Sequence, residues 1–75
     1  MMRLRDVLEK VDILQLIELY KEGDGIMDLF CYKNNIHYRY MNNPVLFIGT
    51  RQDEIKGDVL FIEIGKLKVL NNDNN

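Results

Sequence analysis

The sequence predicts an α+β fold, in which one N-terminal helix packs on a mostly antiparallel meander sheet of about five strands. Three observations predict it: one N-terminal stretch with helical spacing of its apolar residues, several short apolar runs separated by turn residues, and a length of only 75 residues. A chain of this length forms one small core. We therefore expect a single globular domain over residues 1–70.

The predicted helix lies at the start of the chain. Four apolar residues follow the spacing i, i+3, i+4, i+7 and share one helical face: Leu4, Val7, Leu8 and Val11. The helical pattern fails beyond Leu14, because the apolar residues that follow would scatter around a helix. A strand is therefore expected from about Gln15.

Turn residues then divide the chain at Gly23-Asp24-Gly25, at Asn34-Asn35 and at Asn42-Asn43-Pro44. The last two strands are expected at Val45–Thr50 and Val59–Ile64, joined by a polar loop. Both are apolar on both faces, which is typical of central strands or of a sheet curled toward a small barrel. The segment from Leu67 to Leu70 could extend the last strand, and the polar tail 71–75 is expected to be disordered.

Loop lengths predict how the middle strands pair. A two-residue loop at Asn34-Asn35 pairs Tyr32 with His37 and Phe30 with Arg39. A three-residue loop at Gly23-Asp24-Gly25 pairs Ile17 with Cys31 and Leu19 with Leu29, whereas a two-residue loop would turn Ile17 and Leu19 toward the polar side. Directly paired residues share a face of the sheet. The predicted core face carries Ile17, Leu19, Met27, Leu29, Cys31, Ile36, Tyr38 and Tyr40.

The opposite face is the predicted binding surface, because it mixes aromatic rings with charged side chains. Its candidate binding residues are Tyr20, Phe30, Tyr32, His37 and Arg39. Tyr, Phe and Arg are enriched at protein interfaces, and the same residue types stack single-stranded bases. A third interpretation is an ordinary cross-strand pair between Phe30 and Arg39 with no binding role.

Composition narrows the function further. The formal net charge is −2, whereas nucleic-acid binding usually uses a basic surface. The chain has no serine, one threonine, one cysteine (Cys31) and one histidine, so we expect no enzyme, no structural metal and no cofactor. The apolar runs are too short to span a bilayer and the first residues do not resemble a signal peptide, so a cytoplasmic protein is expected.

The general layout resembles small phage and mobile-element proteins of uncharacterised function. The resemblance is carried by the opening Leu4–Leu8, the strand-turn-strand pattern and the closing Val59–Ile64, together with eight asparagines. Such proteins often inhibit host machinery, as anti-CRISPR and anti-restriction proteins do. The resemblance implies an inhibitor or regulator of a host protein, and it supplies no functional residues.

The function predicted from these observations is a non-catalytic protein-binding module that acts on a host protein by occlusion. Two alternatives remain open at this point. One is a single-stranded nucleic-acid-binding module that uses the same aromatic and arginine side chains. The other is a structural homodimer that pairs exposed strand edges.

Overall fold

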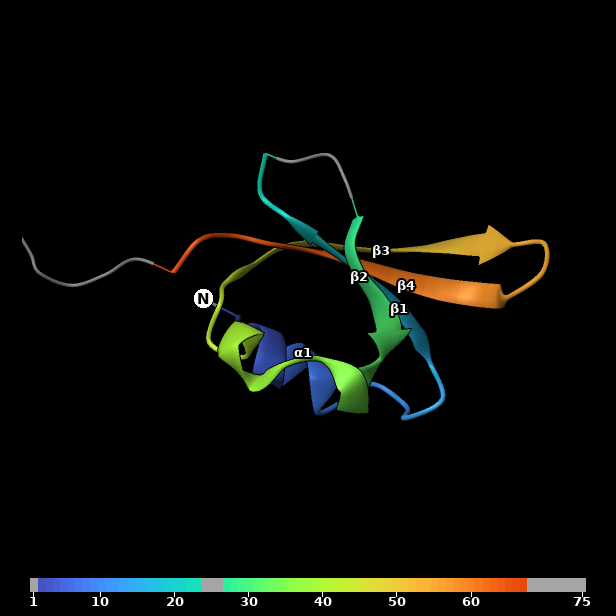
Figure 1. Cartoon of the computed structure of the whole chain (residues 1–75), viewed down its shortest axis with the longest axis horizontal. Helices are drawn as coiled ribbons and strands as arrows, with labels where there is room; N and C mark the ends of the chain where they lie inside the picture. The colour runs from blue at the N-terminus through green and yellow to red at the C-terminus, as the bar shows by residue number, and fades with distance from the viewer. Residues whose placement is uncertain (1, 24–26, 68–75) are drawn as a thin grey trace, which may run out of the picture.

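A four-stranded mixed sheet and one short helix make up most of the fold (Figure 1). The computed structural model describes residues 2–23 and 27–67. Its elements are α1 (Leu4–Leu8), β1 (Leu16–Lys21), β2 (Met27–Tyr32), β3 (Val45–Asp53) and β4 (Gly57–Ile64), with two 3₁₀ turns, η1 (Lys33–Asn35) and η2 (Tyr38–Tyr40). The predicted α+β class is confirmed. The predictions for Asp24, Gly25 and residues 68–75 lie outside the described residues.

The sheet order is β2-β1-β4-β3, and the two central strands run parallel. In that pairing Leu16 lies opposite Val59 and Lys21 opposite Ile64. The outer pairs, β1 with β2 and β3 with β4, are antiparallel. The prediction of a five-stranded meander is therefore wrong in two respects: the described chain has four strands, and its last strand returns to pair with the first. The sheet is also open and does not close into a barrel.

The β1–β2 register agrees with the three-residue-loop prediction at Ile17 and Leu19, but it shifts between Leu19 and Tyr20, so that Tyr20 lies opposite Met27. Ile17 lies opposite Cys31, and Leu19 lies opposite Leu29. The β3–β4 hairpin is longer than predicted, because both strands extend into the segment expected to be a polar loop. Asp53 closes the turn: its carboxylate accepts hydrogen bonds from the backbone N–H groups of Ile55 and Lys56, both at 2.9 Å.

The predicted strand over residues 36–41 is wrong, and none of its pairings with β2 forms. After β2 the chain enters η1, and the Lys33 ammonium donates a 3.0 Å hydrogen bond to the carbonyl of Leu8 at the end of α1. Ile36 then enters the core with 5% of its surface exposed. His37 starts η2, because its Nδ1 accepts the backbone N–H of Arg39. These contacts, both local and with the distant residue Leu8, replace the expected ladder.

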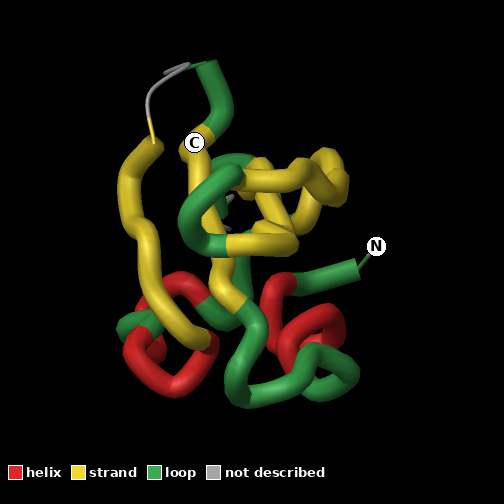
Figure 2. The backbone as a smooth tube through the Cα atoms, turned by 90° about the vertical axis from the view of Figure 1, so that its right-hand side faces the viewer, coloured by secondary structure: helices red, strands yellow, loops and turns green. Residues whose placement is uncertain are grey.

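The main core cluster joins residues of α1, β1, β4 and the η1–η2 connection. Its buried members are Leu4, Val7, Leu8, Ile17, Leu19, Ile36, Ile62 and Ile64. Tyr38, predicted to belong to this core, is 80% exposed. Figures 1 and 2 show the helical segments gathered on one side of the sheet. No helix in the described part of the chain has the length and apolar character that a membrane crossing requires.

Candidate functional site

The sheet face turned away from the helical segments is the candidate site, and we call it the open face. Side chains alternate between the two faces of a strand, and the strand registers align the residues of each face. No helix covers the open face within residues 2–23 and 27–67. Its main residues are Leu16, Glu18, Tyr20, Phe30, Tyr32, Phe47, Gly49, Arg51, Asp53, Val59, Phe61 and Glu63.

Three aromatic rings form a cluster on this face. Phe61 of β4 lies centrally, with its ring centroid 5.4 Å from that of Phe47 and 6.5 Å from that of Tyr20. The Tyr20 ring meets Phe61 nearly edge-on, at 81°, which is a favourable aromatic geometry. Gly49 makes this arrangement possible, since a Cβ atom there would lie 2.5 Å from Cζ of Phe61.

A shallow hollow of about 280 Å³ lies beside the rings. Its walls combine the three aromatic side chains with four charged ones: Glu18, Lys21, Arg51 and Glu63. Phe47 is 53% exposed, whereas Tyr20 and Phe61 are half-buried. The hollow therefore offers apolar surface with charged groups at its rim, which is the composition of many protein-binding sites.

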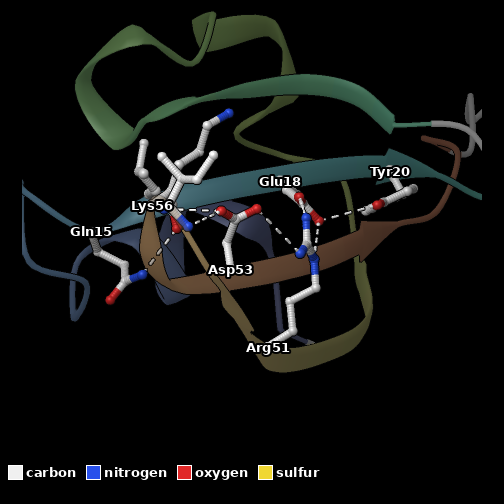
Figure 3. A network of polar contacts seen from close by, with 8 residues as sticks. Gln15, Glu18, Tyr20, Arg51, Asp53 and Lys56 are labelled. Carbon is white, nitrogen blue, oxygen red and sulfur yellow. Dashed lines mark hydrogen bonds and ion pairs between the residues drawn. The ribbon is translucent and has the colours of Figure 1, made fainter.

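Figure 3 shows Glu18 with the side chains of Arg51 and Tyr20 directed toward its carboxylate. Glu18 is only 2% exposed and lies between Phe30 of β2 and Phe61 of β4, its two cross-strand neighbours. Arg51 reaches it from β3: Nε donates to Oε1 at 3.2 Å, and Nη2 forms an ion pair with Oε2. The Tyr20 hydroxyl donates to Oε1 at 3.1 Å. Both carboxylate oxygens therefore have partners, as a buried charge requires.

These contacts determine the ionisation of the site. The hydrogen bond from Arg51 lowers the pKa of Glu18 below its ordinary value, although burial acts in the opposite direction. Burial and the bond to Glu18 raise the pKa of Tyr20. Asp53 at the hairpin turn has a lowered pKa because it accepts the two backbone N–H bonds of the turn. Glu18 is thus a carboxylate, and Tyr20 a neutral phenol, at neutral pH.

Three of the five predicted binding residues lie on the open face, and two do not. Tyr20, Phe30 and Tyr32 share it through the β1–β2 register. Phe30 is partly covered by Lys56, whose ammonium lies 3.9 Å from its ring centroid, while Tyr32 is 44% exposed.

His37 and Arg39 belong to the η1–η2 region instead, which corrects their predicted position. The His37 ring stacks on Tyr38 with 4.5 Å between centroids. The Arg39 guanidinium lies 5.0 Å from the Tyr40 ring centroid and donates to its hydroxyl at 3.0 Å. Neither residue belongs to a strand of the sheet.

Four further residues of the open face were not predicted from the sequence: Phe47, Arg51, Phe61 and Glu63. Their strands look apolar on both faces, so no polar face could be recognised in them. Alternate residues of a strand share a face, and this spacing could have grouped them. Phe47, Gly49 and Arg51 are spaced in this way, and so are Val59, Phe61 and Glu63. What could not be recognised is that β4 lies beside β1, since that parallel pairing joins segments 43 residues apart in the register.

Glu63 differs from Glu18 in having no ion-pair partner among the described residues, although Lys21 lines the same hollow. It is half-buried at the rim of the hollow and makes no hydrogen bond or ion pair with the described part of the chain. Cys31, by contrast, packs against the core on the other face, where burial raises the pKa of its thiol.

Comparison with protein families, curated proteins and solved structures gave no match to this chain.

Proposed function

We propose that this chain is a non-catalytic protein-binding module that docks a partner protein on its open face. The observation that carries the proposal is the aromatic hollow with Glu63 at its rim, a half-buried carboxylate that forms no ion pair with the described residues. Aromatic rings that are partly exposed beside a rigid sheet act as anchors at interfaces. The resemblance to phage and mobile-element proteins makes a host protein the expected partner and occlusion the expected mode of action.

The charges of the site suggest the chemistry of that partner. A carboxylate that becomes covered without a counter-charge loses its hydration and weakens binding. The partner surface should therefore bring a lysine or arginine to Glu63. Next to it, an apolar side chain should enter the hollow between Phe47 and Tyr20. The expected epitope is an apolar side chain flanked by a cation.

Single-stranded nucleic acid fits this face less well, although the rings could stack on bases. Glu18, Asp53 and Glu63 place three carboxylates on it, and these repel phosphates. The guanidinium of Arg51 already forms the ion pair with Glu18. If nucleic acid were the ligand, affinity would fall steeply with salt, and the substitution Glu63→Lys would strengthen binding.

The test is affinity capture from host extract followed by a quantitative titration with the purified partner. Phe47→Ala and Glu63→Lys should each weaken binding about tenfold or more, as removal of an interface anchor typically does. Tyr38→Ala is the matched control, because that ring is 80% exposed in η2, outside the open face. An affinity lost in Tyr38→Ala and kept in Phe47→Ala would refute the assignment.

A further inference from the structure

The outer edge of β3 is the feature from which we draw a further inference. β3 is the last strand in the sheet order, and its start is covered on the outside. There the N–H of Val45 donates to the carbonyl of Met2 at 2.9 Å, while the carbonyl of Pro44 points the other way and accepts the N–H of Gly65. Beyond this bridge, no strand of the described chain pairs with the outer edge of residues 47–53.

This free edge lacks the devices that usually prevent edge pairing. Natural edge strands are blunted by proline, by bulges or by unpaired charges. Here Pro44 and the bulge between Val45 and Phe47 both stand before the free segment. The charge of Arg51 is paired with Glu18 on the same sheet. Three consecutive apolar residues are exposed instead: Leu46 by 48%, Phe47 by 53% and Ile48 by 40%.

We propose that a second copy of this chain pairs antiparallel with β3, forming a continuous eight-stranded sheet across a two-fold axis at Thr50. Directly opposite residues of an antiparallel pair share a face. Pairing of the free segment, residues 47–53, with itself places its midpoint, Thr50, on the axis. Ile48 is then flanked by the second copy on the face opposite the hollow, and the free backbone groups of the edge gain partners.

The side chains that this register brings together are compatible. Thr50 faces Thr50 of the second copy, a favourable cross-strand pair. Ile48 faces Gln52, and Gly49 faces Arg51, so no like charges stand directly opposite one another. Since Gly49 has no side chain, the Arg51 stem of the second copy can lie beside the Phe47 and Phe61 rings.

The pairing also has a consequence for binding. The two-fold axis is perpendicular to the sheet, so the open faces of both copies lie on the same side. A dimer would therefore present two hollows in one plane and could hold a two-fold symmetric partner at both sites, with a gain from avidity. The dimer itself does not depend on the proposed partner binding.

The first test is the mass in solution by sedimentation velocity over a range of concentrations. The wild-type chain of 8.9 kDa should sediment as a dimer that dissociates on dilution. Ile48→Lys should raise the dissociation constant at least tenfold, because it places a charge at the edge, while its alkyl stem still covers the neighbouring apolar surface. Ile55→Lys is the matched control, since Ile55 is 92% exposed in the β3–β4 turn. A wild-type monomer at the highest soluble concentration, or equal effects of the two lysines, would overturn the proposal.

The second test addresses the register and does not require a destabilising variant. In a Cys31→Ala background, a short bismaleimide should cross-link Thr50→Cys rapidly, since the two cysteines face each other across the axis. Gln52→Cys should react slowly, because its two copies are separated by four residues, or about 13 Å along the strands. Faster cross-linking of Gln52→Cys would exclude this register.

The dimer through β3 and the binding of a partner on the open face can be tested independently. Ile48 lies on the opposite face from the hollow and does not line it. Ile48→Lys should therefore become monomeric and still bind the partner one to one. Glu63→Lys lies on β4, away from the free edge, so it should lose the partner and remain dimeric.

Discussion

Arg51 of β3 closes over Glu18 of β1 across the intervening strand β4, so the two residues tie three strands of the sheet together on its open face. Their exposures differ sharply: the Glu18 side chain is 3% exposed and that of Arg51 is 45% exposed. The pair is therefore a buried carboxylate under a partly hydrated guanidinium. The buried charge of Glu18 needs Arg51 to compensate it, whereas the guanidinium of Arg51 is partly hydrated and needs Glu18 far less.

Arg51→Met should lower the urea midpoint of unfolding markedly, because among the described residues it leaves the buried Glu18 carboxylate with Tyr20 alone as a side-chain donor. The double variant Glu18→Leu/Arg51→Met should recover most of the loss, since replacing both partners of a buried pair by apolar residues is often tolerated. Gln52→Met, on the other face of the same strand, is the control. If the single variant Arg51→Met unfolds at the wild-type midpoint, the pair has no structural role.

Stability should also fall at acidic pH. The folded pKa of Glu18 is lowered, so its contribution is fully present above the ordinary glutamate pKa of about 4.3 and is lost as pH falls through the folded value. The pKa of Asp53 is also lowered in the folded state, so its contribution to stability is likewise lost as pH falls. Urea unfolding between neutral pH and pH of about 3 should show this decrease. In Glu18→Gln the decrease should be shallower, and an unchanged slope would show that Glu18 does not contribute to it.

Local sequence signals were sufficient for part of the β1–β2 pair. The alternation of apolar residues predicted that Ile17 lies opposite Cys31 and Leu19 opposite Leu29, whereas the register shift between Leu19 and Tyr20 was not predicted. The α+β class followed from the same periodicity. These are interactions between neighbouring segments, and their geometry is determined by alternation and by turn chemistry.

The segment around η2 could not be predicted in this way. Tyr38-Arg39-Tyr40 alternates like a strand, but its conformation is decided by contacts with distant residues. The backbone N–H of Arg5 donates to the carbonyl of Met41 at 3.0 Å, and that of Leu4 donates to the carbonyl of Asn43 at 3.0 Å. These backbone hydrogen bonds hold the segment against the start of α1, and the local sequence pattern does not indicate them.

The candidate site was predicted only for its β1 and β2 residues for the same reason. Tyr20 and Phe30 come from strands adjacent in sequence, whereas Phe61 and Arg51 reach the open face only because β4 lies beside β1. A long-range parallel pairing leaves no turn signal at either strand. The aromatic cluster therefore arises from the parallel pairing of β1 with β4, and neither strand predicts it alone.

Gly49→Ala should destabilise the fold by about 1–2 kcal/mol, because a methyl group there overpacks the aromatic cluster. The new Cβ would lie 2.5 Å from Phe61 Cζ and 2.9 Å from Phe47 Cε2, so the rings must shift. Chemical denaturation measures the loss. In a Phe61→Leu background the same substitution should cost less, since the smaller side chain leaves room. Strictly additive costs would mean that the two sites do not touch.

Lys33 connects the end of α1 to η1, and its removal should loosen both. Its ammonium donates to the carbonyls of Leu8 and Val11 just after the end of α1, and the Leu8 carbonyl also accepts the backbone N–H of Val11. Lys33→Met keeps the stem and removes these bonds, so we expect a loss of about 1–2 kcal/mol. Lys10→Met is the matched control, because Lys10 is exposed and the described chain provides no partner for its ammonium. Hydrogen exchange should localise the effect, with faster exchange at the N–H of Ile36, which η1 holds through its bond to the Lys33 carbonyl. Equal stability of the two variants would contradict a structural role for Lys33.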